Sequence, residues 1–247
     1  MNYTPVNRPA PLKNVAAFTT LIQTVVERRA DLPGLACFYG KSGLGKTKAA
    51  IYGANKYRAV YVECGQFTSA RSLLRQILQE VGVQNPRGTV TELIEDAVRI
   101  LVSQADRPLI VDEAHWIAHK RFVDVLRELH DKSTVPVILI GEETLPKQLE
   151  TFERVHNRIL SWVQAYPCDL EDFALLAASV CAGVKIAGDL AQAIIEATAG
   201  NTRRIVVNLA AAEQKANQLG VGTLDLATFG GRQAIIGSRA PNPRGML

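Results

Sequence analysis

One stretch of the sequence has the residue types and spacing needed to bind phosphate groups. Gly40-Lys41-Ser42-Gly43-Leu44-Gly45-Lys46-Thr47 matches the pattern G-x-x-x-x-G-K-S/T. Glycines let such a loop curl until its N–H groups point at phosphate oxygens, and a following helix adds positive charge. Lys46 would reach the β- and γ-phosphates, and the Thr47 hydroxyl would ligate Mg²⁺. We therefore predict an ATP–Mg²⁺ site made by these eight residues and Lys48. The alternative is a glycine turn that carries Lys-Thr by chance.

A second stretch supplies the carboxylates that such a site needs. The apolar run Leu109-Ile110-Val111 ends in Asp112 and Glu113. Asp112 is expected to hold Mg²⁺ through water, and Glu113 to polarise the attacking water. The alternative is an apolar strand that ends in two acids by chance. His115 and His119 have the i, i+4 spacing of a metal pair, but no third ligand is evident, so solvated histidines are favoured.

Apolar runs predict the elements that position these residues. The run at 35–39 reads as a strand before the loop, and the segment from Lys48 reads as a helix after it. Continuous apolar runs that alternate with helical segments predict a parallel sheet covered on both faces, a three-layer α/β/α arrangement. One further strand is expected between the strand of the loop and the acidic strand. The five expected strands are residues 35–39, 59–63, 109–113, 135–141 and 161–166, and helices are expected at 13–29, 91–103 and 120–131.

The texture of the sequence changes after Pro167, which predicts a second, smaller domain. Asp169 is a suitable helix N-cap, and alanine-rich segments with helical spacing follow it. Glycine, arginine and proline dominate the last residues, as in a basic disordered segment. The sequence thus predicts an N-terminal arm at 1–12, an α/β domain at 13–167, an all-helical lid at 168–230 with helices at 170–182, 188–199, 202–218 and 223–230, and a basic disordered tail at 231–247.

Composition excludes several classes of protein. No apolar run approaches the roughly 20 residues that span a bilayer, and residues 1–14 lack the pattern of a signal peptide. The four cysteines are widely spaced and form no C-x-x-C pair, which argues against a disulfide framework and against zinc. The net charge of +4 permits a polyanionic partner without requiring one. We expect a cytoplasmic protein with no membrane association.

The loop, the inserted strand, the Asp-Glu strand, the fourth strand and the helical lid together resemble the AAA+ ATPases over residues 13–230. The resemblance implies a P-loop AAA+ core with ATP hydrolysis. It also implies a polar sensor residue at the end of the fourth strand, in contact with the nucleotide. Glu142 stands at that position, where the family usually has Asn, Thr or Ser, so the sequence departs from the family there.

The same resemblance implies two arginines that act on the nucleotide. One precedes the fifth strand and reaches the γ-phosphate of a neighbouring subunit; Arg158 matches this position better than Arg154. The other lies in the lid, where Gly200-Asn201-Thr202-Arg203 matches the family's G-x-x-R pattern. Cations in the first turn of a helix oppose its dipole at a cost of about 0.3–1 kcal/mol each, which a facing triphosphate would recover. Solvated arginines are the alternative in both places.

The sequence resembles the transposition regulators, which are the phage Mu B protein and the TnsC-type ATPases. The features that carry this resemblance are the stretch Leu32-Pro33-Gly34-Leu35, the short lid and the compact size. That resemblance implies ATP-dependent, sequence-nonspecific binding to double-stranded DNA as a homo-oligomer, a helical filament or ring. It further implies target selection through a transposase, in the bacterial cytoplasm at the nucleoid. The Mu protein has an N-terminal helix-turn-helix domain that is absent here. The tail at 231–247 is the one candidate contact for a transposase.

In those regulators, DNA is lined by the loop and helix start after the second strand and by the start of the next helix. The guanidinium of Arg71 and nearby N–H groups could meet a phosphate there; ordinary caps and solvated arginines are the alternative. A helicase-loader-type ATPase on single-stranded DNA, for which no stacking aromatic is obvious, and a secretion-type ATPase that binds only protein remain open. The corresponding residues are Thr68, Ser69, Arg71, Arg87, Thr89 and Thr91.

Overall fold

A computed structural model describes residues 11–237 of the chain. The chain divides into two compact units. Among the described residues, the first consists of Asn14–Lys41 and Lys46–Ala165, and the second consists of Ser42–Gly45 and residues 11–13 and 166–237. The second unit therefore begins two residues before the predicted boundary and includes the tip of the glycine-rich loop. Residues 1–10 of the predicted arm lie outside the described residues, whereas Leu12 packs against the core of the second unit.

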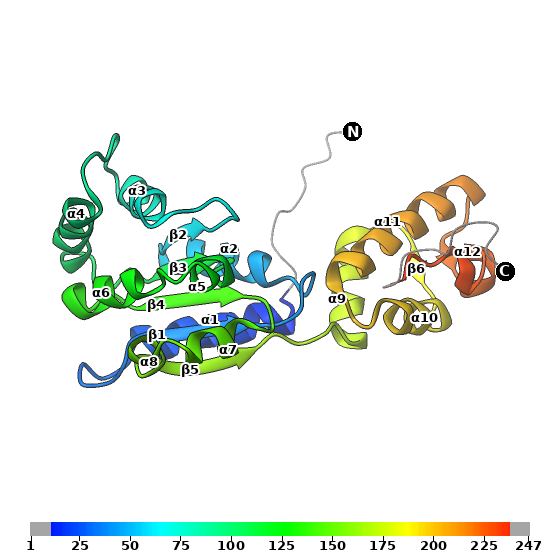
Figure 1. The fold of residues 1–247 in the computed structure, drawn as a ribbon. Coiled ribbons are helices and arrows are strands. Elements are labelled where there is room, and N and C mark those ends of the chain that lie inside the picture. The colour runs from blue at the N-terminus through cyan, green and yellow to red at the C-terminus, as the bar shows by residue number, and fades with distance from the viewer. Residues whose placement is uncertain (1–10, 238–247) are drawn as a thin grey trace, which may run out of the picture. The chain divides into compact units, whose positions relative to one another are not determined.

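The first unit is built on a five-stranded parallel sheet (Figure 1). β4 pairs with β1 on one side and with β3 on the other, which confirms the predicted inserted strand. β5 continues the ladder on the free side of β1, and Leu35 N–H already donates to the carbonyl of Arg158. The fifth strand therefore begins two residues earlier than predicted. The order is β2 (Val60–Glu63), β3 (Leu109–Asp112), β4 (Val137–Gly141), β1 (Leu35–Tyr39) and β5 (Ile159–Gln164).

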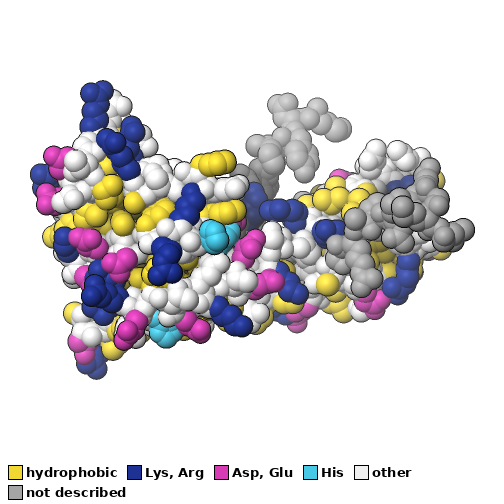
Figure 2. All heavy atoms as spheres, viewed as in Figure 1, with side chains coloured by type: hydrophobic (Ala, Val, Ile, Leu, Met, Phe, Trp, Pro, Cys, Tyr) yellow, Lys and Arg dark blue, Asp and Glu magenta, His cyan; other side chains and the backbone are white. Residues whose placement is uncertain are grey.

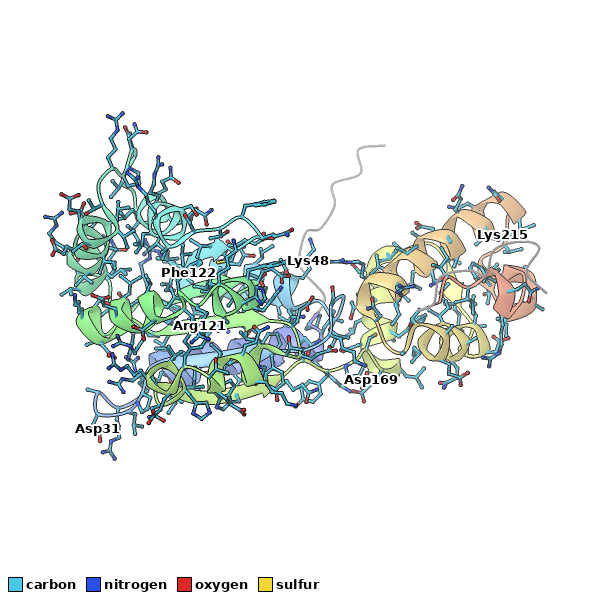
Figure 3. The ribbon with its side chains drawn as sticks, viewed as in Figure 1. Asp31, Lys48, Arg121, Phe122, Asp169 and Lys215 are labelled. Atoms are coloured by element: carbon cyan, nitrogen blue, oxygen red, sulfur yellow. The ribbon has the colours of Figure 1, made fainter. Side chains whose placement is uncertain are left out.

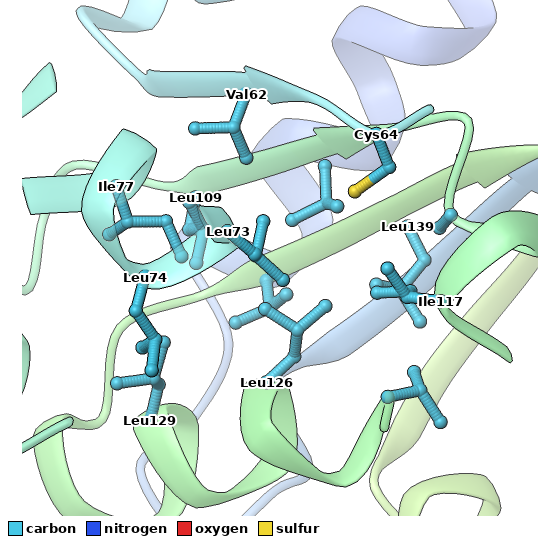
Figure 4. Packing of buried hydrophobic residues seen from close by; sticks show 14 of the residues in the cluster. Val62, Cys64, Leu73, Leu74, Ile77, Leu109, Ile117, Leu126, Leu129 and Leu139 are labelled. Atoms are coloured by element: carbon cyan, nitrogen blue, oxygen red, sulfur yellow. The ribbon is translucent and has the colours of Figure 1, made fainter. Parts of the chain in front are cut away.

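Helices cover both faces of this sheet. Successive side chains of a strand point to opposite faces, so strands that are apolar throughout must be covered on both sides. On one face, the rings of Phe18 in α1 and Phe38 in β1 are 5.2 Å apart, and Gly53 of α2 leaves room for Phe18 and Ile22. On the other face, leucines and isoleucines of α3 and α6 pack on β3 and β4 (Figure 4). The helices are α1 (Lys13–Val26), α2 (Lys46–Tyr57), α3 (Ala70–Glu80), α4 (Val90–Val102), α5 (His115–His119), α6 (Asp124–Ser133), α7 (Leu145–Glu150) and α8 (Glu153–His156).

The second unit is helical with one short parallel ladder. Its core is formed by residues such as Leu190, Ile194, Ile205 and Leu209, all fully buried. Asp169, labelled in Figure 3, caps the first helix by accepting the Asp172 N–H at 3.1 Å. The two-residue strands are an addition to the predicted all-helical lid. The elements are α9 (Leu170–Val180), β6 (Lys185–Ile186), α10 (Gly188–Thr198), α11 (Thr202–Leu219), β7 (Thr223–Leu224) and α12 (Leu226–Phe229).

The prediction of a disordered tail from residue 231 is wrong for its first seven residues. A 3-10 turn spans Arg232–Ala234, and Ile235 is buried against the second unit's core. The fully buried amide of Asn208 donates to the Ile236 carbonyl at 3.1 Å and accepts the Ile236 N–H at 2.9 Å. A buried amide needs hydrogen-bond partners, so the backbone of this segment supplies the partners of Asn208, and Asn208 in turn holds the segment on α11. Residues 238–247 lie outside the described residues. No described helix is long and apolar enough to cross a bilayer.

Candidate nucleotide-binding site

The loop after β1 has the backbone shape of a phosphate-binding loop. Gly43 and Gly45 have φ angles of 85° and 84°, in the left-handed region that residues with a Cβ rarely adopt. A Cβ on Gly43 would also lie 2.4 Å from the side chain of Asn201. α2 begins directly at Lys46, so the loop ends at a helix N-terminus, where N–H groups and the helix dipole favour an anion. Thr47 is half-buried in the first turn, and Lys48 is exposed (Figure 3).

Lys46 is held inside the curve of this loop. Its side chain is 8% exposed, and Nζ donates to the carbonyls of Gly40 at 2.7 Å and Lys41 at 2.9 Å. Burial lowers the pKa of Lys46, and the nearby carboxylates, chiefly Glu113 and Asp112, oppose that shift. A desolvated ammonium bound only to neutral carbonyls retains most of its attraction for an incoming anion.

Asp112 lies at the carboxyl end of β3 and is 1% exposed. Its Oδ2 accepts the hydroxyl of Tyr61 at 3.0 Å, and its Oδ1 accepts the N–H of Glu113 at 2.8 Å. Burial, followed by the charge of Asp112, raises the pKa of Tyr61, so the phenol stays protonated and remains a donor. Tyr61 therefore fixes the orientation of the Asp112 carboxylate. Tyr61 belongs to no sequence motif; its only signal in the sequence is a polar tip on an aromatic residue of the strand next to β3.

Glu113 has an unusual backbone conformation. Its φ of 54° lies in the left-handed region, which costs a residue with a Cβ about 1–3 kcal/mol and is found mainly at functional sites. Burial and then the charge of Asp112 raise the pKa of Glu113. Its Oε2 is 3.2 Å from Nδ1 of His115, whose own pKa is lowered by burial. A half-buried carboxylate with a raised pKa, next to a buried cation, is suited to act as a general base.

Two further predicted features lie near this edge of the sheet. Glu142 directly follows β4 and is exposed, and its charge partly opposes the lowering of the Lys46 pKa by burial. A carboxylate accepts hydrogen bonds where Asn, Thr or Ser could donate them, so a sensor role for Glu142 stays a prediction. His115 packs its ring against Trp116, with centroids 5.1 Å apart. Within residues 11–237 no cluster of three or more His, Cys, Asp or Glu has the geometry of a metal site.

In the second unit, the first turn of α11 is hydrogen-bonded to the loop tip, Ser42–Gly45. Asn201 accepts the Arg204 N–H at 3.1 Å, as a helix cap does, and its Nδ2 donates to the Ser42 carbonyl at 2.9 Å. The backbone N–H of Arg203 donates to the Gly43 carbonyl at 3.0 Å. Arg203 itself is exposed. The sequence identified Asn201 only as a cap, because a contact 159 residues away leaves no local signal.

Replacing Asn201 by serine tests this contact. Serine also caps helices, so α11 should keep its start, but it lacks the donor that holds the Ser42 carbonyl. We expect Asn201→Ser to weaken nucleotide binding about fivefold, the worth of one net hydrogen bond. Fluorescence anisotropy of a labelled ATP analogue measures this. Asn217→Ser, at an exposed position in the last turn of the same helix, is the matched control. Equal affinities for all three proteins would contradict the expectation.

The two candidate trans arginines lie at the other edge of the sheet from the loop. Arg158 immediately precedes β5, so it stands at the amino edge, whereas Asp112 and the loop lie at the carboxyl edge. Its Nε donates to Oδ1 of Asp131 at 3.0 Å. Burial alone would raise the pKa of Asp131, but hydrogen bonds from Arg158 and Arg127 outweigh it and lower that pKa. Arg154 is exposed on α8. Arg158 therefore lies at the opposite edge of the sheet from the loop of the same chain.

Some of the predicted DNA-binding hydroxyls act as helix caps. Ser69 accepts the Ser72 N–H at 3.2 Å at the start of α3, and Thr89 accepts the Glu92 N–H at 3.3 Å at the start of α4. These two hydroxyls cap helices, and their contact with DNA stays a prediction. α3 separates the two predicted segments, and its 11 residues span about 16 Å. Lys and Arg side chains stand out on the α3–α4 end of the first unit (Figure 2). Arg71, Arg87 and Thr91 are exposed, and Thr68 is half-buried.

Comparison with known proteins finds a family and a relative of this chain. The model of a family described as an AAA domain matches residues 28–149. The chain is 28% identical over 116 residues to the Mu-like prophage FluMu DNA transposition protein B of Haemophilus influenzae. That match covers 44% of this chain and only 38% of the relative.

Solved structures share the fold at low sequence identity. The ORC2 protein of Aeropyrum pernix, in its ADPNP–ADP complexes, has a TM-score of 0.67 at 16% identity over 95% of this chain and 69% of that one. The ORC1 protein of the same organism, in complex with DNA, has a TM-score of 0.62 at 20% identity, over 92% and 66%. A Walker-type ATPase of Pyrococcus abyssi has a TM-score of 0.64 at 14% identity, over 94% and 73%. These likenesses show the fold alone.

Proposed function

Because this chain belongs to the AAA+ ATPases and is related to a phage transposition protein B, we propose that ATP assembles it on double-stranded DNA. In this proposal the protein binds DNA without sequence preference, forms a helical filament or ring, and marks the target for a transposase. It acts in the cytoplasm of a bacterial host, at the nucleoid. One observation supports the proposal most strongly. Lys46 is buried in the loop, where the negative charges of Asp112 and Glu113 act on it, and the chain is related to a transposition protein.

The residues of the site fit a nucleotide with magnesium. Mg²⁺ prefers oxygen ligands, and each Asp112 oxygen accepts one hydrogen bond, which leaves lone pairs for magnesium-bound water. Thr47 offers a hydroxyl in the first turn of α2. When bound, the ion neutralises charge on the β- and γ-phosphates. Lys46 would bind the same phosphates, and Glu113 would orient and deprotonate the attacking water.

Arginines complete the proposed site. Arg203, in the first turn of α11, contacts the nucleotide in cis. Arg158, or else Arg154, comes from a neighbouring subunit, which agrees with a position at the opposite edge of the sheet. Arg158 must then exchange its ion pair with Asp131 for one with the γ-phosphate. This exchange makes the oligomer depend on a nucleotide that carries a γ-phosphate.

Exposed cations support duplex binding through the DNA backbone. Arg71 stands in the first turn of α3 and Arg87 precedes α4, both exposed. The exposed Thr91 and the cap hydroxyls of Ser69 and Thr89 add neutral contacts to phosphates. Such contacts give affinity without reading the sequence, and their strength falls steeply with salt.

We expect Arg71→Ala to weaken duplex binding and to leave nucleotide affinity unchanged. The removal of one phosphate contact should also lower the slope of log affinity against log salt by about 1. Salt titrations of duplex binding, with labelled nucleotide measured in parallel, test both statements. An equal fall in nucleotide affinity would show that Arg71 does not belong to the DNA surface.

Electron microscopy tests the proposed function as a whole. With a non-hydrolysable ATP analogue and duplex DNA at low salt, the protein should coat the duplex as a regular oligomer, and without nucleotide it should not. Monomers under the first condition would refute the proposal. Competition with single-stranded oligonucleotides identifies a helicase-loader-type ATPase if the single strand wins. A secretion-type ATPase that binds only protein would show no salt-sensitive affinity for DNA.

A further inference from the structure

A tight turn between β2 and α3 presents an aromatic ring to solvent. In the turn Gly65–Thr68, the Thr68 N–H donates to the Gly65 carbonyl at 3.0 Å, and the Gly65 N–H donates to Oγ1 of Thr68 at 2.8 Å. Nζ of Lys120 donates to the Thr68 carbonyl at 2.9 Å. The turn is therefore closed by two of its own hydrogen bonds and fixed from outside by a third.

Phe67 occupies this turn and is 91% exposed. The most exposed of the other large apolar side chains among the described residues reach 54%. Transfer of a phenylalanine from water into an apolar environment is favourable by about 1.5–3 kcal/mol, so full exposure forgoes that gain. The hydrogen bonds of the turn fix the backbone from which the ring projects. A rigidly presented aromatic is the type of side chain that carries binding energy at interfaces.

Two cations lie close to the turn that carries Phe67, and carboxylates lie near Cys64, just before it. Lys120 reaches the residue next to it and uses one of three ammonium protons on Thr68, so two remain for a phosphate. Arg71 lies four residues further on, exposed in the first turn of α3. The exposed acid nearby along the chain is Glu63, at the end of β2. An exposed aromatic ring with two cations on the same turn and helix start matches a nucleic acid, in which bases and phosphates lie close together, better than an apolar protein groove.

We propose that Phe67 is the apolar DNA contact of this protein: the ring enters the minor groove of duplex DNA and wedges against a base step, while Lys120 and Arg71 bind the flanking phosphates. The inference rests on the proposed duplex binding. Apolar wedges of this kind unstack a base step without reading its sequence, so the contact suits a protein without target preference. The sequence alone does not indicate this contact, because the exposure of a phenylalanine in a loop depends on how the turn closes.

The test compares two kinds of loss. Phe67→Ala should weaken duplex binding about tenfold, as expected for a base-contacting aromatic, and leave the salt slope unchanged. Arg71→Ala should lower the slope. Phe67→Leu should retain most of the affinity, since leucine also serves as a wedge. Duplexes that contain 2-aminopurine should brighten when the wild-type protein binds, through unstacking, and should not brighten with Phe67→Ala.

Controls separate this inference from the proposed function. Val102→Ala, at another exposed apolar position of the first unit, should bind DNA as the wild type does, and Phe67→Ala should bind nucleotide normally. If Phe67→Ala binds duplex DNA as tightly as the wild type does, the inference is overturned and the proposed function stands. A loss of single-strand affinity alone, or of assembly without DNA, would also overturn it. If the wild type itself does not bind duplex DNA in an ATP-dependent way, both the inference and the proposed function are overturned.

Discussion

Glu113→Gln protein is expected to bind ATP at least as well as the wild type and to hydrolyse it about 10²–10⁴-fold more slowly. Glutamine keeps the size of the side chain but cannot accept a proton. The same left-handed backbone conformation serves both residues, so the loop after β3 should be retained. Loss of a negative charge beside Asp112 also reduces repulsion of the phosphates. Slow hydrolysis with intact binding should leave the protein assembled on DNA in the presence of ATP.

Single-turnover hydrolysis with radiolabelled ATP, with nucleotide binding measured in parallel, tests this prediction. Glu150→Gln, an exposed acid at the end of α7, is the matched control and should behave as the wild type does. If Glu113→Gln hydrolyses ATP at the wild-type rate, another group activates the water, and the role assigned to Glu113 is wrong.

Lys46→Gln is expected to weaken ATP binding by about 10- to 100-fold. The ammonium would supply charge-assisted hydrogen bonds to the phosphates, each worth about 1.5–3 kcal/mol, and glutamine offers only neutral ones. Lys46 Nζ donates to the carbonyls of Gly40 and Lys41, which the amide of glutamine can partly satisfy. The fold should therefore survive the change.

Titration of a fluorescent ATP analogue measures this loss, and thermal unfolding confirms that the variant is folded. Lys56→Gln, in the last turn of α2, makes the same change of charge away from the loop and should bind normally. Equal losses in both variants would mean that net charge, rather than the position of Lys46, determines affinity.

The parts of the site that could be predicted from the sequence are those formed by consecutive residues in a local motif. The loop from Gly40 to Thr47 and the pair Asp112–Glu113 each combine a local motif with an apolar strand, and the parallel sheet follows from the apolar runs. The orientation of Asp112 depends on Tyr61, which is 51 residues away and has no motif. The exposure of Phe67 likewise depends on how one turn closes.

The segment at 231–237 is ordered although its composition predicts disorder. Its glycines and arginine are typical of disorder, but Ile235 and Ile236 follow directly. The partner that orders them is Asn208, 28 residues earlier on α11, where a polar residue looked like part of an ordinary helix face. Hydrogen bonds between one buried amide and a distant segment cannot be predicted from neighbouring residues alone.

The central claim is that ATP held by Lys46 assembles this protein on duplex DNA, and one measurement tests it most directly. Duplex binding by the wild type and by Lys46→Gln should be titrated at one salt concentration, each with and without a non-hydrolysable ATP analogue. We predict tight, regular coating of the duplex only by the wild type with the analogue. If Lys46→Gln takes up the analogue and coats duplexes at wild-type levels, the account is contradicted.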